Sequence, residues 1–210
     1  MDGFFEYPRS PHARQHGPQG YSSYNSYKPW LRDEFSFRCV YCLIRELWHG
    51  GSDFFGVDHL KPRRFSRELE CLYDNLVYAC NRCNWLKGDR AVVPDPCEVA
   101  YGLHLRVDSE GLIVPMSDEG RMVARVFLLN QPELAEFRRR LRVTIARLVS
   151  AAGNEELAES WLCYPRDLPD LCTLRPPEGN TRPNGAVNCC FERRRRGELD
   201  SIYLSTSNGR

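Results

Sequence analysis

Four of the ten cysteines in this chain of 210 residues form two C-x-x-C pairs. Cys39 and Cys42 make the first pair, and Cys80 and Cys83 make the second. Each such turn presents two thiolates to one point, so the two pairs together supply the four sulfur ligands of a tetrahedral zinc ion. Because a site with four protein ligands is closed, we expect this zinc to stabilise the fold and to take no part in a reaction.

Two alternatives to a zinc site stay open at this point. The cysteines can simply be buried thiols, and a C-x-x-C pair can also carry out redox chemistry, although the βαβ pattern of thioredoxin-like proteins is absent here. The 37 residues between Cys42 and Cys80 exceed the ~15–20 of a plain zinc ribbon. We therefore expect a folded segment between the two pairs.

Polar residues between and just after the cysteine pairs are suited to phosphodiester hydrolysis, which needs a base for the attacking water and a cation near the phosphate. His59 suits the role of base, because an imidazole titrates near ~6.5 and is largely neutral at pH 7. Asp58 offers a carboxylate oxygen, and Asn84 offers an amide oxygen from the start of a predicted helix. Two such ligands with open water positions match Mg²⁺.

Basic residues near these positions are candidate substrate contacts. Lys87 follows Asn84 by three residues, so the two side chains share a helix face and Lys87 is expected to meet a phosphate near the metal. Three further cations are expected to form a basic rim: Arg63, Arg64 and Arg90. The net charge of the chain is only +1, so any nucleic-acid surface must be a local patch.

The order of these short motifs closely resembles the HNH endonuclease family. The motifs are C-x-x-C, D-H-x-x-P, N-L and C-x-x-C-N-x-x-K-G, and they match the zinc-knuckle branch in its H-N-N variant, over about residues 27–96. The resemblance implies a ββα-metal fold, in which two short antiparallel strands and a helix surround one catalytic Mg²⁺ or Mn²⁺ ion. It implies DNA as the substrate, cleaved to leave a 5′-phosphate and a 3′-hydroxyl. It also implies that Asn75 ties down the loop that carries His59 and orients the imidazole.

The last motif position departs from the family pattern, because it is Asn84 and not histidine. Imidazole favours transition metals more than an amide oxygen does, so we expect Mg²⁺ and Mn²⁺ to support activity better than Zn²⁺ or Ni²⁺. No third carboxylate is evident nearby, which disfavours a mechanism with two metal ions.

A non-catalytic function is the main alternative. Taken singly, Asp58 and His59 can be surface polar residues, and Asn75 and Asn84 can be helix caps. A zinc-knuckle module that binds nucleic acid or a protein would explain the cysteines and the basic residues. It would leave the coincidence of the four polar residues unexplained.

The whole chain is predicted to have an α+β fold in four parts. Residues 1–26 are rich in Tyr, Ser, Gly, Pro and His and predict a flexible arm. Residues 27–96 hold the nuclease-like core and begin with a short amphipathic helix over 27–35. Residues 97–172 predict a small extension of strands and helices, and residues 173–210 predict a disordered tail that is rich in Pro, Gly, Asn and Arg.

Within the extension, apolar runs predict strands at 104–107, 112–114 and 122–129. Apolar residues at helical spacing after Pro132 predict a helix that ends near Gly153, and Asn154 is placed to cap a shorter helix through Trp161.

Location and biological role are less constrained by the sequence. No apolar run reaches the ~20 residues of a membrane span, and the first residues lack the pattern of a secretory signal, so we expect a cytoplasmic protein. Restriction, phage defence, toxin activity and a mobile element are all compatible with such a domain. A homodimer and a partner protein of a defence system are both open, and the residues alone do not separate DNA from RNA.

Overall fold

The computed structural model describes three stretches of the chain, residues 5–89, 92–150 and 154–202. They contain helices and two small antiparallel sheets, which confirms the predicted α+β class. Arg90, a predicted substrate contact, lies outside these stretches. Within them, no helix combines the length and the apolar character that crossing a membrane requires.

The chain divides into two compact units. One, which we call the cysteine unit, comprises residues 13–93 and 165–200. The other, the helical unit, comprises residues 1–12, 94–164 and 201–210. The cysteine unit thus contains residues 27–93 of the predicted core together with residues 13–26 and 165–200.

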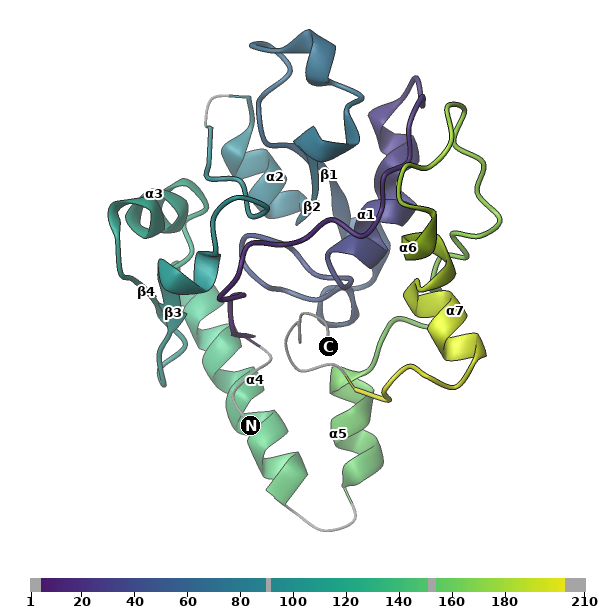
Figure 1. The fold of residues 1–210 in the computed structure, drawn as a ribbon. Coiled ribbons are helices and arrows are strands. Elements are labelled where there is room, and N and C mark those ends of the chain that lie inside the picture. The colour runs from purple at the N-terminus through teal and green to yellow at the C-terminus, as the bar shows by residue number, and fades with distance from the viewer. Residues whose placement is uncertain (1–4, 90–91, 151–153, 203–210) are drawn as a thin grey trace. The chain divides into compact units, whose positions relative to one another are not determined.

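Two strands and a helix form the core of the cysteine unit (Figure 1). Strand β1 (Phe55–His59) pairs antiparallel with strand β2 (Leu76–Cys80), and His59 lies opposite Leu76 in this register. Helix α2 (Asn81–Lys87) follows β2 directly and contacts both strands. Gly88 ends the helix at a φ of 52°, a conformation that favours glycine. This is the ββα arrangement that the motifs predict.

Helix α1 (Lys28–Glu34) packs against the same two strands, and it matches the helix predicted over 27–35. Its apolar residues Trp30 and Leu31 are buried, as the helical spacing requires. Pro29 lies in the first turn, where a missing N–H leaves no hydrogen bond broken.

A buried polar network ties α1 to β2. The Arg32 guanidinium donates to both carboxylate oxygens of Glu46, at 2.9 and 2.8 Å. The hydroxyl of Tyr78 on β2 donates to the same carboxylate at 2.7 Å. Each buried polar group thus has a partner, which removes the cost of leaving it unpaired.

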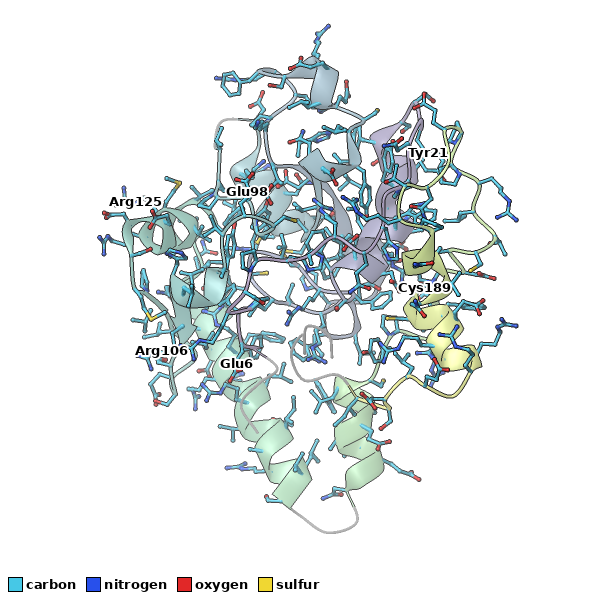
Figure 2. The ribbon with its side chains drawn as sticks, viewed as in Figure 1. Glu6, Tyr21, Glu98, Arg106, Arg125 and Cys189 are labelled. Atoms are coloured by element: carbon cyan, nitrogen blue, oxygen red, sulfur yellow. The ribbon has the colours of Figure 1, made fainter. Side chains whose placement is uncertain are left out.

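Two segments predicted to be flexible or disordered are packed within the cysteine unit. In the N-terminal one, His16 is fully buried and its Nε2 lies 2.9 Å from the Asp33 carboxylate. The C-terminal one contains helices α6 (Pro183–Val187) and α7 (Cys190–Arg195), and the backbone N–H of Cys190 donates to the same carboxylate at 2.8 Å. Figure 2 labels Cys189, the buried residue that precedes α7.

Composition measures apolar content and does not record long-range hydrogen bonds such as these, so it does not predict the packing of these segments. The last part of the predicted tail, residues 203–210, lies outside the described residues.

Among its described residues, the helical unit contains two short strands and three α-helices. Strands β3 (Leu105–Val107) and β4 (Ile113–Pro115) pair antiparallel, as predicted. Helix α4 (Pro132–Ser150) and helix α5 (Glu155–Leu162) also lie where predicted and contact each other. Asn154 precedes α5 but makes no capping hydrogen bond with its side chain.

The strand predicted at 122–129 is wrong, because most of it lies in helix α3 (Asp118–Val126). Ser117 caps this helix, since its hydroxyl accepts a hydrogen bond from the backbone N–H of Gly120 at 3.1 Å. Asp118 and Glu119 then place negative charge in the first turn, which stabilises a helix start. These residues just before the apolar run favour a helix over a strand in the run.

Candidate active site

The four predicted zinc ligands come together in the cysteine unit. The Sγ atoms of all four cysteines lie within 4.8 Å of one another, and all four residues are buried. The Sγ atoms of Cys42 and Cys80 are 3.7 Å apart, close to the ~3.8 Å edge of a tetrahedron with zinc–sulfur bonds of ~2.3 Å. The donor set and its spacing therefore fit a tetrahedral ion such as zinc.

Local backbone structure sets the two turns, which we call the first knuckle (residues 39–42) and the second knuckle (residues 80–83). In the first, the N–H of Cys39 donates to the carbonyl of Ile44 at 2.9 Å, and the N–H of Leu43 donates back to Cys39 at 3.0 Å. In the second, Cys80 ends β2 and caps α2. Hydrogen bonds from the three neighbouring thiols lower the pKa of Cys80, whereas burial raises the pKa of Cys39 and hydrogen bonds to the neighbouring cysteines raise that of Cys83. A thiolate is the form that a metal ion binds.

The Asp58 carboxylate is held by two donors from different elements. Asp58 lies on β1 and is only 3% exposed. The Tyr41 hydroxyl donates to Oδ2 at 2.6 Å, and Lys87 Nζ donates to Oδ1 at 3.1 Å. Burial raises the pKa of Asp58, and the two donors oppose this shift by stabilising the charged form. Each oxygen keeps a second lone pair, so the carboxylate can still act as a metal ligand.

Lys87 does not lie where a substrate contact was predicted. Its side chain is buried, and Nζ donates to the Asp58 carboxylate and to the backbone carbonyl of His59. The residue shares a helix face with Asn84, as predicted, but that face packs against β1. The ammonium therefore compensates a buried carboxylate and holds the end of the strand.

The His59 imidazole is oriented by a backbone carbonyl. Its Nε2 lies 3.0 Å from the carbonyl oxygen of Glu70. Because a carbonyl only accepts, Nε2 carries the proton and Nδ1 is the basic nitrogen. No hydrogen bond from the described residues reaches Nδ1. Burial lowers the pKa of His59 below 6.5, which keeps the ring neutral at pH 7.

Asn75 joins the two ends of the loop that connects β1 to β2. Its Oδ1 accepts from the N–H of Lys61 at 2.8 Å, and its Nδ2 donates to the carbonyl of Leu69 at 3.1 Å. No hydrogen bond joins Asn75 to the imidazole within the described part of the chain. Asn75 thus contacts the backbone of the loop that follows His59 and carries Glu70.

Asn84 is half-buried on α2 and faces β1. Its Nδ2 donates to the carbonyl of Val57 at 3.1 Å, which leaves Oδ1 as the available acceptor. Val57 directly precedes Asp58, so the amide lies along the strand that carries both other polar residues.

The predicted basic rim is exposed where the structure describes it. Arg63 pairs with the Glu70 carboxylate at 3.2 Å, and its guanidinium lies over the ring of Tyr24. The ring of Tyr24 in turn packs edge-on against the His59 imidazole, with centroids 4.8 Å apart. Arg64 lies over the exposed ring of Phe65.

Sequence reasoning missed three contacts at this site. Tyr41 lies inside the first knuckle, and its position between two cysteines was the only pointer to a role. Glu70 contacts His59 through its backbone carbonyl, and every residue has such a carbonyl, so the side-chain type does not reveal this role. The structural role of Lys87 depends on which strand its helix covers, and spacing along one helix does not reveal this.

Comparison with known proteins places this region in a family. Residues 39–90 match the family model described as HNH endonuclease. No curated protein and no solved structure matches the chain. The matched range contains both knuckles, the polar residues of β1 and Asn84. Residues 39–90 of this chain therefore form an HNH endonuclease domain.

Proposed function

We propose that this protein is a metal-dependent endonuclease that hydrolyses phosphodiester bonds in DNA. His59 is the general base, and Asp58 and Asn84 hold one Mg²⁺ or Mn²⁺ ion. One observation carries the proposal: the hydrogen bond from Nε2 to Glu70 leaves Nδ1 of His59 basic, next in sequence to a buried carboxylate. The family match supports nucleic-acid cleavage as the reaction class.

The residues of this chain divide the work of hydrolysis. Nδ1 of His59 takes a proton from the attacking water, and the Glu70 carbonyl stabilises the imidazolium through Nε2–H. Asp58 and Asn84 offer the oxygen ligands that Mg²⁺ prefers. The ion, when bound, supplies positive charge for the phosphate and the leaving oxygen.

The four cysteines are proposed to hold a structural zinc ion. Asn84 directly follows Cys83, so the sulfur ligands fix the start of the helix that carries the amide. A small core buries little apolar surface and gains little stability from packing. Binding of a metal ion then adds to the free energy of folding.

Exposed residues around the site are proposed to contact the nucleic acid. Arg63 and Arg64 lie on the loop after β1 and offer charge to phosphates. Trp85, next to Asn84, is 80% exposed and offers a ring on which a base can stack. We propose DNA as the substrate in place of RNA on the basis of the family resemblance.

The direct test is nicking of a supercoiled plasmid by the full chain. The wild-type protein should nick with Mg²⁺ and stop when EDTA is added before the substrate. His59→Ala should lose nicking while its zinc content and melting temperature stay unchanged. His49→Ala is the matched control, because His49 is an exposed histidine of the same unit, and it should nick as the wild type does. Nicking by His59→Ala at the wild-type rate would remove the base assignment.

The choice of metal ion tests the role of Asn84. Mg²⁺ and Mn²⁺ should support nicking, and Ni²⁺ and Zn²⁺ should support it weakly, because the ligands are oxygens. Activity with Ni²⁺ alone would count against the proposed ligand pair.

One observation favours the alternative of a non-catalytic module. Lys87 already supplies Asp58 with a positive charge, as a bound cation would. This alternative predicts that the chain binds nucleic acid without cutting it in any of the four ions.

A further inference from the structure

We propose that Tyr41 is a positioning residue through which the first knuckle controls the binding of the catalytic divalent ion at Asp58. The inference rests on the proposed function. It assigns a role to a side chain that neither ligates the zinc nor contacts the substrate.

The position of the Tyr41 hydroxyl is fixed by the first knuckle. Tyr41 lies between Cys39 and Cys42, its side chain is fully buried, and its hydroxyl donates to Asp58 Oδ2 at 2.6 Å. The neighbouring N–H of Val40 donates to the carbonyl of Tyr78 at 3.0 Å, which attaches the turn to β2. Ligation of the two sulfurs therefore places the phenol as well.

Helix α2, which starts in the second knuckle, supplies the opposing donor. Lys87 lies one helical turn after Cys83, and its Nζ donates to the other carboxylate oxygen, Oδ1, at 3.1 Å. With one donor on each oxygen, the plane of the Asp58 carboxylate is set from both knuckles. Outer contacts of this kind orient a metal ligand, and their loss typically costs 10–100-fold in metal affinity or activity.

Loss of the phenol hydroxyl would change this balance. Of the two donors to the Asp58 carboxylate, Lys87 alone would then remain. The carboxylate could turn both of its oxygens toward the ammonium. The ammonium would then compete with the divalent ion for the same lone pairs. We therefore expect weaker ion binding, even though one competing hydrogen bond has been removed.

Tyr78 provides a matched control. It is also fully buried in the cysteine unit, and its hydroxyl also donates to a buried carboxylate, at 2.7 Å. That carboxylate belongs to Glu46, which pairs with Arg32 and is not a proposed ligand. Tyr78→Phe thus removes a phenol hydrogen bond of the same kind at a place without metal chemistry.

The experiment titrates zinc-loaded full-length protein with Mn²⁺ and measures the free ion by electron paramagnetic resonance, without nucleic acid. The zinc content of each sample is measured, and binding is expressed per zinc-loaded chain. Tyr41→Phe should keep its zinc and bind Mn²⁺ about tenfold more weakly than the wild type. Tyr78→Phe should bind as the wild type does. The Mn²⁺ concentration for half-maximal nicking should shift in the same way.

Equal Mn²⁺ binding by Tyr41→Phe and wild type would overturn the inference, and so would an equal loss in both tyrosine variants. If the wild type itself bound no Mn²⁺ beyond the zinc site and did not nick plasmid, the proposed function would fail first. A wild type that binds and nicks, beside a Tyr41→Phe protein that matches it, would reject the role of Tyr41 alone.

Discussion

At the scale of single residues, the chemistry of His59 follows from its surroundings more than from its type. The Glu70 carbonyl selects the tautomer, and the ring of Tyr24 covers one side of the imidazole. Burial disfavours the charged form and so lowers the pKa. A neutral ring with one basic nitrogen is what a general base requires near pH 7.

The pH dependence of nicking tests this description. Only the neutral imidazole accepts a proton, so the rate should rise with pH through the pKa of His59 and level off above it. Because burial lowers that pKa, the pH at which the rate is half-maximal should lie below 6.5. Initial rates at saturating Mg²⁺ measure this, and a midpoint above 6.5 would contradict the assigned environment.

Lys87→Gln separates a structural lysine from a phosphate contact. Its removal leaves the buried Asp58 carboxylate without its ion-pair partner, which typically costs about 3 kcal/mol of stability. Chemical denaturation should show this loss, while the salt dependence of DNA binding should stay unchanged.

The exposed Arg64 gives the opposite expectation. Arg64→Gln should leave the free energy of unfolding unchanged and weaken DNA binding, with a smaller salt slope. A Lys87→Gln protein that behaved like Arg64→Gln would restore Lys87 as a phosphate contact.

At the scale of elements, the spacing of motifs predicted the core well. The family resemblance implied two antiparallel strands and a helix without giving their bounds, and the structure has them as β1, β2 and α2; α1 lies where apolar spacing predicted a helix, over 27–35. Apolar periodicity and fixed cysteine spacing are local properties, so they can be read along the chain. The strand predicted at 122–129 is wrong because Ser117, which caps helix α3, lies before the apolar run and outside its pattern.

Asp33 of α1 contacts the segments at both ends of the cysteine unit. Its two carboxylate oxygens contact the His16 ring and the backbone of Cys190. Neither contact has a sequence signature, because the partners are 17 and 157 residues away. Composition therefore predicted flexibility where long-range hydrogen bonds hold the chain.

Asp33→Ala should release both segments. The loss of two buried hydrogen bonds to a carboxylate should cost about 3 kcal/mol and raise amide exchange around His16 and around Cys190. Hydrogen exchange measured by mass spectrometry checks this, with the exposed carboxylate variant Asp53→Ala as control. Unchanged exchange in both segments would show that other contacts hold them.

At the scale of the whole molecule, one unit contains the four-cysteine cluster and the proposed site of the catalytic ion. The second knuckle lies where β2 ends and α2 begins, the first knuckle contributes the Tyr41 donor, and α2 contributes the Lys87 donor. The family motifs predicted the ligand types and their order. They did not predict the contacts between elements, because these depend on how the loop between the strands and the outer segments pack.

Cys80→Ser tests the dependence of the fold on zinc. The variant should lose zinc and lose the cooperative unfolding of the cysteine unit, because ligation supplies folding energy. Cys71→Ser is the control, since Cys71 lies outside the four-sulfur group, and it should keep both. Metal analysis and thermal melts measure the two properties. A Cys80→Ser protein that melts like the wild type would contradict the four-thiolate site.

The most direct measurement of the central claim is anomalous diffraction from crystals of the protein that contain zinc and Mn²⁺. We expect a zinc peak among the four sulfurs of the knuckles. A separate manganese peak is expected in contact with oxygens of Asp58 and Asn84, on the side of His59 where Nδ1 lies. A manganese peak elsewhere, or none while Lys87 keeps its contact with Asp58, would contradict the account.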